Sequence, residues 1–450
     1  MLNYISGFFS KGHNRSLIVK KNIFYSLIIK GGSIAISLVL IPLTIRFVNE
    51  TQYGLWLTLS SIIGWFSFFD IGLGNGLKTR LTEAISKGDF KQGKTYVSTT
   101  YAALSILSIS LLILFSVMQL FVDWSKILNA PASYAPELSG VAWIVFISFT
   151  FQFVLNLIIA VAAANQNTVV GSLVNLVGNL ITITAVYFLT KFYVTGTLLQ
   201  LAVPMCLSSI LVLLIFSIIL YQKRFRAIAP SISFVDFSCL KDVAGLGLKF
   251  FIIQMGLILY YNIDNMVITQ ILGPKEVTPY AIAYKYFGVI TMFSAIVMTP
   301  LWTAFAEAHA KQDYNWIKMT VRKMQLICLA LVPVGVVMVL ISPYVYKFWV
   351  GEEIEIPMLL SAILAFYTIW NTFRTIFIYY LNGVGVIKLQ VYLVLLSGLA
   401  NVPLAIILAK LMGTSGVILS TTILCIICGI IEIIQYRKLI NQKAQGLWMK

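Results

Sequence analysis

Residues 197–221 read TLLQLAVPMCLSSILVLLIFSIILY, a stretch without Asp, Glu, Lys or Arg. Its length is sufficient for one helix to cross the apolar core of a bilayer. Eleven further stretches of similar length and character flank it, and charged or turn-forming residues separate them. The sequence therefore predicts twelve membrane-spanning helices, at 23–47, 53–77, 97–121, 140–164, 168–190, 197–221, 244–270, 279–304, 319–342, 357–382, 389–410 and 414–436.

The composition of the whole chain agrees with this pattern. Of its 450 residues, 59% are hydrophobic and only 11% are charged, whereas a soluble domain carries about 25% charged residues. These values exclude a soluble enzyme, a nucleic-acid-binding protein and a secreted disulfide scaffold. The net charge of +16 is explained by the basic residues that gather in the cytoplasmic loops of membrane proteins, so no nucleic-acid partner is expected.

The basic residues also predict the orientation of the chain. Twenty-two of the 32 lysines and arginines fall in the two terminal segments and in alternate loops, and the other set of loops holds six. Because the basic loops face the cytoplasm, both termini are expected there. The four remaining cations lie inside predicted spans.

An internal repeat divides the chain into halves. Shifted by 224 residues, GLKTRLTEAISKGDFKQGK at 76–94 aligns without gaps with PLWTAFAEAHAKQDYNWIK at 300–318, with seven of nineteen positions identical. Each half then holds six spans and starts on the same side of the membrane, so the halves should be related by a pseudo-twofold axis along the membrane normal. Chance similarity between two amphipathic loops is the alternative explanation.

The sequence thus predicts an all-α polytopic membrane protein of two six-helix bundles. The expected parts are a cytoplasmic N-terminal segment at 1–22, an N-terminal lobe at 23–221, a basic cytoplasmic linker at 222–242, a C-terminal lobe at 243–436 and a cytoplasmic tail at 437–450. The five cysteines lack a His or acid at metal-ligand spacing, so no metal site is predicted.

Short motifs near the second and eighth spans carry a family resemblance. Pro42, the Tyr-Gly-Leu-Trp at 53–56, the Asp-Ile-Gly-Leu-Gly-Asn-Gly at 70–76 and Arg80 resemble the start of a Wzx-type polysaccharide or O-antigen flippase of the MOP exporter superfamily. The Leu-Gly-Pro at 272–274, with Val277 and Tyr280, resembles the corresponding entry to span eight. The resemblance covers the chain in topology, and its motifs are concentrated at about 20–95 and 244–320.

The resemblance implies a MATE-like fold in which spans one, two, seven and eight line a central cavity. It implies a multi-pass protein of the bacterial inner membrane that moves an undecaprenyl-diphosphate-linked oligosaccharide, an O-antigen or capsule repeat unit, to the outer leaflet. Partners would be this lipid-linked oligosaccharide, membrane lipid and other polysaccharide-assembly proteins. No cofactor and no covalent chemistry are implied, so the protein would not be an enzyme.

Charged residues inside the spans suggest where such a substrate would bind. Each costs about 2.5–3.5 kcal/mol at the centre of a helix on insertion scales, so they are expected to have a function. We predict that a cationic cavity binds the diphosphate through Lys30, Lys249, Lys285 and Arg374. Snorkelling of the first two toward the interface is the alternative.

The acidic residues allow two interpretations. Asp70 and Asp264 could bind a driving proton or sodium ion, or Asp264 could form a salt bridge with Lys285 of the neighbouring span. Glu432 is placed near the end of its span. The glycines at 72, 74 and 76 are interpreted as positions where helices approach closely, because the strand of a dinucleotide-binding motif and the carboxylates of a calcium loop are missing.

Three rival functions stay open. A multidrug exporter of the same superfamily would favour an acidic cavity, whereas cations outnumber deep acids here. A lipid II flippase typically has two further C-terminal spans. A glycan polymerase or ligase would require a larger extracytoplasmic catalytic loop than the sequence provides.

Overall fold

The computed structural model describes residues 14–70, 72–165, 167, 169–240, 256 and 263–449, and throughout those ranges every regular element is a helix. Eight of the described helices have the length and apolar composition needed to cross a membrane. Helices satisfy the backbone hydrogen bonds that lipid cannot, which is why long apolar stretches fold in this way. The predicted all-α polytopic fold is confirmed, and the count of twelve spans stays a prediction.

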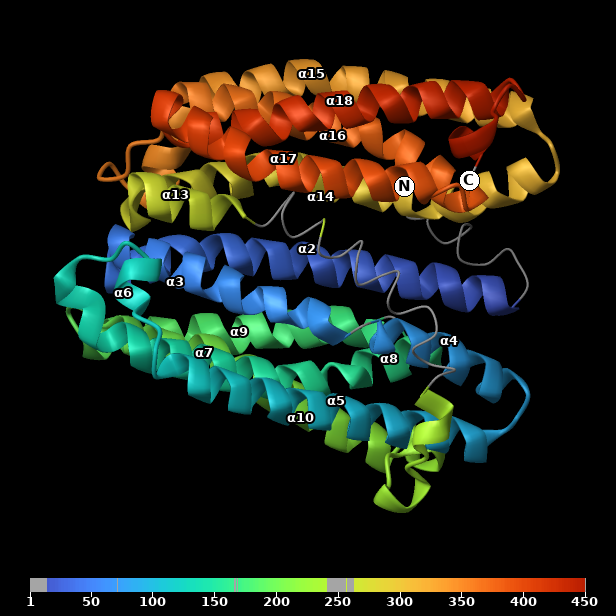
Figure 1. Cartoon of the computed structure of the whole chain (residues 1–450), viewed down its shortest axis with the longest axis horizontal. Helices are drawn as coiled ribbons and strands as arrows, with labels where there is room; N and C mark the ends of the chain where they lie inside the picture. Colours follow the sequence, from blue (N-terminus) through green and yellow to red (C-terminus); the bar gives the residue numbers. More distant parts are fainter. Residues whose placement is uncertain are drawn as a thin grey trace, which may run out of the picture. The chain divides into compact units, whose positions relative to one another are not determined.

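The chain forms two compact units, and the first is built mainly from the N-terminal half (Figure 1). Its core lies between α4, α5, α8 and α10, where Leu77, Leu81, Val97, Ile158 and Val161 are almost fully buried. Around this core α2 packs on α9, and α10 packs on α7 and α9. The elements of this part of the chain are α2 (Asn14–Val48), α4 (Leu73–Ser86), α5 (Phe90–Gln119), α6 (Trp124–Ile127), η2 (Ala132–Tyr134), α7 (Ala135–Leu155), α8 (Leu157–Ala164), α9 (Val169–Phe192) and α10 (Leu198–Gln222).

The second unit contains the C-terminal helices, drawn yellow to red in Figure 1. Within it α16 is central, because it packs on α14, α15 and α18. The α17–α18 turn is tight: a Cβ on Gly416 would lie 2.0 Å from the carbonyl oxygen of Leu408. The elements are α13 (Asp264–Leu272), η6 (Pro274–Glu276), α14 (Val277–Ala310), α15 (Tyr314–Val350), α16 (Met358–Val384), α17 (Lys388–Met412), α18 (Thr414–Ile440) and η7 (Gly446–Met449).

The span predicted at 53–77 is divided into three elements. It consists of α3 (Glu50–Gly64), the 3₁₀ helix η1 (Trp65–Asp70) and the start of α4. Gly72 has φ 72°, in the left-handed region that favours glycine. At this position a backbone turn explains the glycine better than the predicted close helix approach. Residues 50–61 of α3 group with the second unit, and residues 62–64 group with the first.

Local structure confirms the repeat of 224 residues. Asn49 and Gly273, at equivalent positions, have φ angles of 102° and 101°. In the aligned loops Asp89 accepts a hydrogen bond from the Gln92 backbone N–H at 2.9 Å, and Asp313 accepts one from that of Trp316 at 3.0 Å. Both aspartates therefore cap the helix that follows. Chance similarity of two loops would not reproduce the same backbone turn twice.

The described part of the predicted linker packs on α5. It contains η3 (Arg226–Ile228), η4 (Ile232–Phe234) and η5 (Phe237–Cys239). The backbone N–H of Ser231 donates to Ser98 Oγ at 3.0 Å, and that of Asp236 donates to Thr99 Oγ1 at 2.9 Å. The basic segment after α10 is thus held against the first unit as ordered structure.

Candidate functional site

The four predicted cavity cations lie in different settings. Lys30 is exposed on α2 in the first unit, and Lys285 is partly buried on α14 in the second. Lys249 lies outside the described residues. In the described part of the chain, neither Lys30 nor Lys285 forms an ion pair. The backbone of Asp70 lies at the end of η1, and its side chain is not among the described parts of the structure.

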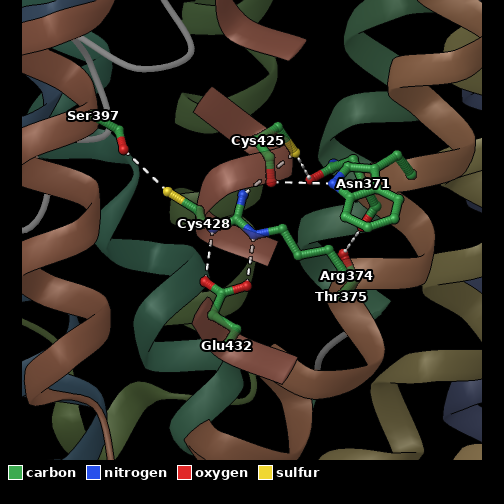
Figure 2. Close-up of polar contacts among 8 residues, drawn as sticks. Asn371, Arg374, Thr375, Ser397, Cys425, Cys428 and Glu432 are labelled. Atoms are coloured by element: carbon green, nitrogen blue, oxygen red, sulfur yellow. Dashed lines mark hydrogen bonds and ion pairs between the residues drawn. The ribbon is translucent and has the colours of Figure 1, made fainter. Parts of the chain in front are cut away.

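Arg374 has a partner that the sequence analysis did not assign. Its Nε donates to Oε2 of Glu432 at 2.7 Å, and its Nη2 donates to Oε1 at 2.8 Å (Figure 2). The side chain of Arg374 is 2% exposed and that of Glu432 is 0% exposed. This bidentate, charge-assisted geometry is the strongest form of an arginine–carboxylate contact, and it joins α16 to α18.

Polar groups of both helices surround this ion pair. Arg374 Nη1 lies 3.6 Å from Cys425 Sγ, which in turn lies 3.7 Å from Oδ1 of Asn371. One turn further along α18, Cys428 Sγ lies 3.0 Å from Ser397 Oγ of α17. Figure 2 shows these groups directed toward one another. The sequence analysis assigned Cys425 and Cys428 no metal, and the structure shows both buried and in polar contact.

The placement of Arg374 argues against its predicted role in binding phosphate. Both carboxylate oxygens of Glu432 already accept from the guanidinium, and removing one partner of a buried ion pair costs about 3–5 kcal/mol. A phosphate would have to displace Glu432 from a site with almost no solvent access. Glu432 is likewise fully buried. We therefore assign this pair a structural role, the joining of α16 and α18.

Asp264 begins α13 and is 6% exposed. Its Oδ2 accepts a hydrogen bond from Tyr280 Oη of α14 at 2.5 Å, whereas its buried Oδ1 has no hydrogen-bond partner among the described residues. Lys285 is not bonded to it, and both residues are described, so the alternative of an Asp264–Lys285 salt bridge is wrong for this structure. Asp264 is thus a buried carboxylate, one oxygen of which has no hydrogen-bond partner among the described residues.

Comparisons with known proteins support the motif-based resemblance. Residues 19–309 match the polysaccharide biosynthesis protein family, and residues 250–407 match the MatE family. The first match covers more than half of the chain. The chain belongs to the polysaccharide biosynthesis protein family. It is therefore a membrane transporter of the polysaccharide branch of the MOP superfamily and not an enzyme.

Curated relatives of the chain include two proteins that are named for O-antigen transport or export. A candidate O-antigen transporter of Salmonella typhi is 25% identical over 309 residues, which span 67% of each chain. A candidate O-antigen export protein of Yersinia pseudotuberculosis is 20% identical over 369 residues, 79% of this chain and 81% of that protein.

Solved structures share the fold at low sequence identity. An inward-facing multidrug resistance MATE transporter superposes with a TM-score of 0.69 at 16% identity, over 93% of this chain and 98% of that one. The lipid II flippase MurJ in an inward closed conformation gives a TM-score of 0.70 at 14% identity, over 94% of this chain and 87% of that one. These likenesses confirm the predicted MOP fold.

Proposed function

We propose that this protein is a flippase that moves an undecaprenyl-diphosphate-linked oligosaccharide across the bacterial inner membrane by alternating access. The family match over residues 19–309 carries the proposal, because it joins the chain to polysaccharide biosynthesis, and two curated relatives are named for O-antigen transport or export. The fold is shared with a lipid II flippase, a protein named for moving a lipid-linked substrate. Both termini face the cytoplasm in this proposal, as the distribution of basic loop residues favours.

The substrate would be held by its charge. A diphosphate attracts lysine amines strongly, because contacts between two ions are shorter and stronger than neutral hydrogen bonds. Lys30 and Lys285 have amines that are not engaged in ion pairs in the described part of the chain, and Lys249 completes the proposed set. Arg374 is removed from the set, since Glu432 occupies its guanidinium.

Transport by purified protein in proteoliposomes tests this function. A fluorescent polyprenyl-diphosphate oligosaccharide is placed in the inner leaflet, and its arrival in the outer leaflet is followed with an impermeant lectin or quencher. We expect transport by the wild type and strong loss in a Lys30→Ala, Lys249→Ala, Lys285→Ala triple variant. Equal rates for wild-type, triple-variant and empty liposomes would refute the proposal.

A driving ion forms a second part of the proposal. The observation that favours it is the buried Oδ1 of Asp264, which has no hydrogen-bond partner in the part of the chain that the structure describes, because a buried polar atom without a hydrogen bond is costly unless a ligand or proton satisfies it. We expect Asp264→Asn to transport at the same rate with and without an imposed proton or sodium gradient. The exposed Glu355 gives a matched control, since Glu355→Gln should retain the gradient dependence. Gradient dependence that survives in Asp264→Asn would contradict this assignment.

A multidrug exporter is the second candidate function, favoured by the MatE match over residues 250–407 and by the MATE fold. Its cationic cargo would be repelled by the lysines described above. Accumulation of a cationic dye in the same proteoliposomes distinguishes the two functions: the flippase proposal expects none.

A further inference from the structure

The beginning of α3 is bound to the second unit. Residues 50–61 belong to this unit together with 253–450, and so does the short segment 127–130. The remainder of α3 and η1 belong to the first unit. A 3₁₀ stretch inside a longer helical segment often marks a hinge, and η1 (Trp65–Asp70) follows directly on α3.

Glycine makes the contact between α3 and η6 close. A Cβ built on Gly54 would lie 1.8 Å from the backbone oxygen of Pro274 and 3.5 Å from Thr278 Oγ1. The hydroxyl of Thr278 donates to the backbone oxygen of Glu50 at 2.7 Å. No side chain larger than hydrogen fits at position 54 while this backbone oxygen keeps its place.

The repeat makes this contact reciprocal. At the offset of 224 residues, Gly54 is equivalent to Thr278 and Glu50 is equivalent to Pro274. The contact of Gly54 with Pro274 and that of Thr278 with Glu50 are therefore two copies of one contact, as in an isologous interface between identical subunits. Such an arrangement is what a pseudo-twofold axis through the crossing of α3 and α14 would produce.

Further polar contacts extend the crossing along α13. Thr58 Oγ1 lies 2.6 Å from Thr269 Oγ1, and both residues are fully buried. The side chain of Asn129 donates to the Thr269 backbone oxygen at 3.3 Å, and that of Gln270 donates to the backbone oxygen of Ile127. Small residues at a helix crossing allow close packing through short polar contacts.

We propose that residues 50–61 act as a latch on α13, η6 and α14, closed in this structure, which must release at Gly54 and Thr58 for substrate to leave at the outer face. The outer location follows from the proposed orientation, and the inference rests on the proposed flippase function. The latch is defined as α3 residues 50–61, and η1 is the hinge about which it would move.

A reversible crosslink tests the latch. The side-chain oxygens of Thr58 and Thr269 are in direct contact, 2.6 Å apart, so cysteines at the two positions would bring their sulfur atoms together, and a Thr58→Cys, Thr269→Cys variant should form a disulfide on oxidation. We expect the oxidised protein to lose transport and the reduced protein to regain it. Full transport by the crosslinked protein, or failure of the two cysteines to crosslink, would overturn the proposal.

Labelling separates the latch from the transport function. In a Cys239→Ser background, where the other four native cysteines are buried, Thr58→Cys should be protected from an impermeant maleimide. Adding Gly54→Ala should raise its labelling rate about tenfold or more, because overpacking at a tight contact is costly. Unchanged labelling would overturn the latch.

The control for this experiment is Gly288→Ala on α14, where a Cβ meets nothing within 4 Å. Alanine favours a helix more than glycine does, so only the steric overlap at Gly54 predicts a loosened contact. The labelling readout needs no substrate. A protein that shows the latch response but moves no lipid-linked oligosaccharide would refute the proposed function and leave the latch in place.

Discussion

Arg374 and Glu432 form a bidentate ion pair between α16 and α18, with N–O distances of 2.7 and 2.8 Å and almost no solvent access. Two charges in such a setting are stable only together, because each one compensates the desolvation of the other. The pair therefore fixes which faces of the two helices meet in the second unit.

Removing one partner of this ion pair should be costlier than removing both. We expect Arg374→Met or Glu432→Leu alone to destabilise the protein by about 3–5 kcal/mol, and the double variant to recover most of this loss. Thermal unfolding in detergent, followed by size-exclusion chromatography, measures the effect. Additive losses in the double variant would show that the two side chains act independently.

The repeated turn offers a matched pair of backbone substitutions. Gly88 and Gln312 occupy equivalent positions with φ angles of 75° and 57°. A left-handed conformation costs a side-chain-bearing residue about 1–2 kcal/mol, so Gly88→Ala should destabilise and Gln312→Gly should stabilise by about this amount. The same unfolding measurement applies, and shifts of equal sign in both variants would contradict the expected equivalence.

His309, beyond the predicted end of span eight, should contribute to acid sensitivity. Its Nδ1 lies 3.1 Å from Tyr380 Oη, and burial lowers the pKa of His309 below its ordinary value of about 6.5. Between the folded-state pKa and about 6.5, His309 is protonated in the unfolded state but mostly neutral in the folded state. The free energy of unfolding therefore falls as the pH drops below about 6.5 toward the folded-state pKa.

Replacement by glutamine measures this contribution. We expect His309→Gln to lose less stability than the wild type between pH 7.5 and pH 5. The difference between the two proteins isolates the histidine from the carboxyl groups that titrate lower. Parallel pH profiles would mean that His309 is equally easy to protonate in both states.

Transport should depend on the charge of Lys285. Loss of one charge-assisted contact to a phosphate costs about 1.5–3 kcal/mol, so Lys285→Ala should slow transport about tenfold to hundredfold, and Lys285→Arg should retain more activity. The exposed Lys410 supplies the control, since Lys410→Ala removes the same charge outside the proposed site. Equal rates in the Lys285→Ala and Lys410→Ala variants would exclude a substrate role for Lys285.

Hydropathy and the internal repeat predicted much of the local structure. The apolar stretch at 197–221 coincides with α10 and its N-cap Thr197, and the aligned loops each place an aspartate, Asp89 or Asp313, at the start of the following helix. An apolar span and a helix start depend on residues that are close together in the sequence, so the sequence alone is sufficient to predict them. The break of the second span at η1 was missed, because its residues are apolar on both sides of the break.

Contacts between helices were harder to predict. Arg374 and Glu432 were each recognised inside a span, but hydropathy does not say which spans are neighbours or how each helix is rotated. For the same reason a salt bridge between Asp264 and Lys285 was one of two interpretations of the sequence, whereas in the structure Asp264 accepts a hydrogen bond from Tyr280. The ion pair could have been suggested by one signal in the sequence: an arginine and a glutamate each lie within an apolar span, and each needs a partner of opposite charge.

The ion pair between α16 and α18 also has a consequence for biosynthesis. Glu432 is synthesised 58 residues after Arg374, a delay of about 3–12 s at typical translation rates of about 5–20 residues per second. Until α18 enters the membrane, the arginine is an uncompensated cation that costs about 2.5–3.5 kcal/mol. A chain that terminates before its last helix keeps this defect permanently, which would mark truncated products for membrane proteases and spare complete ones.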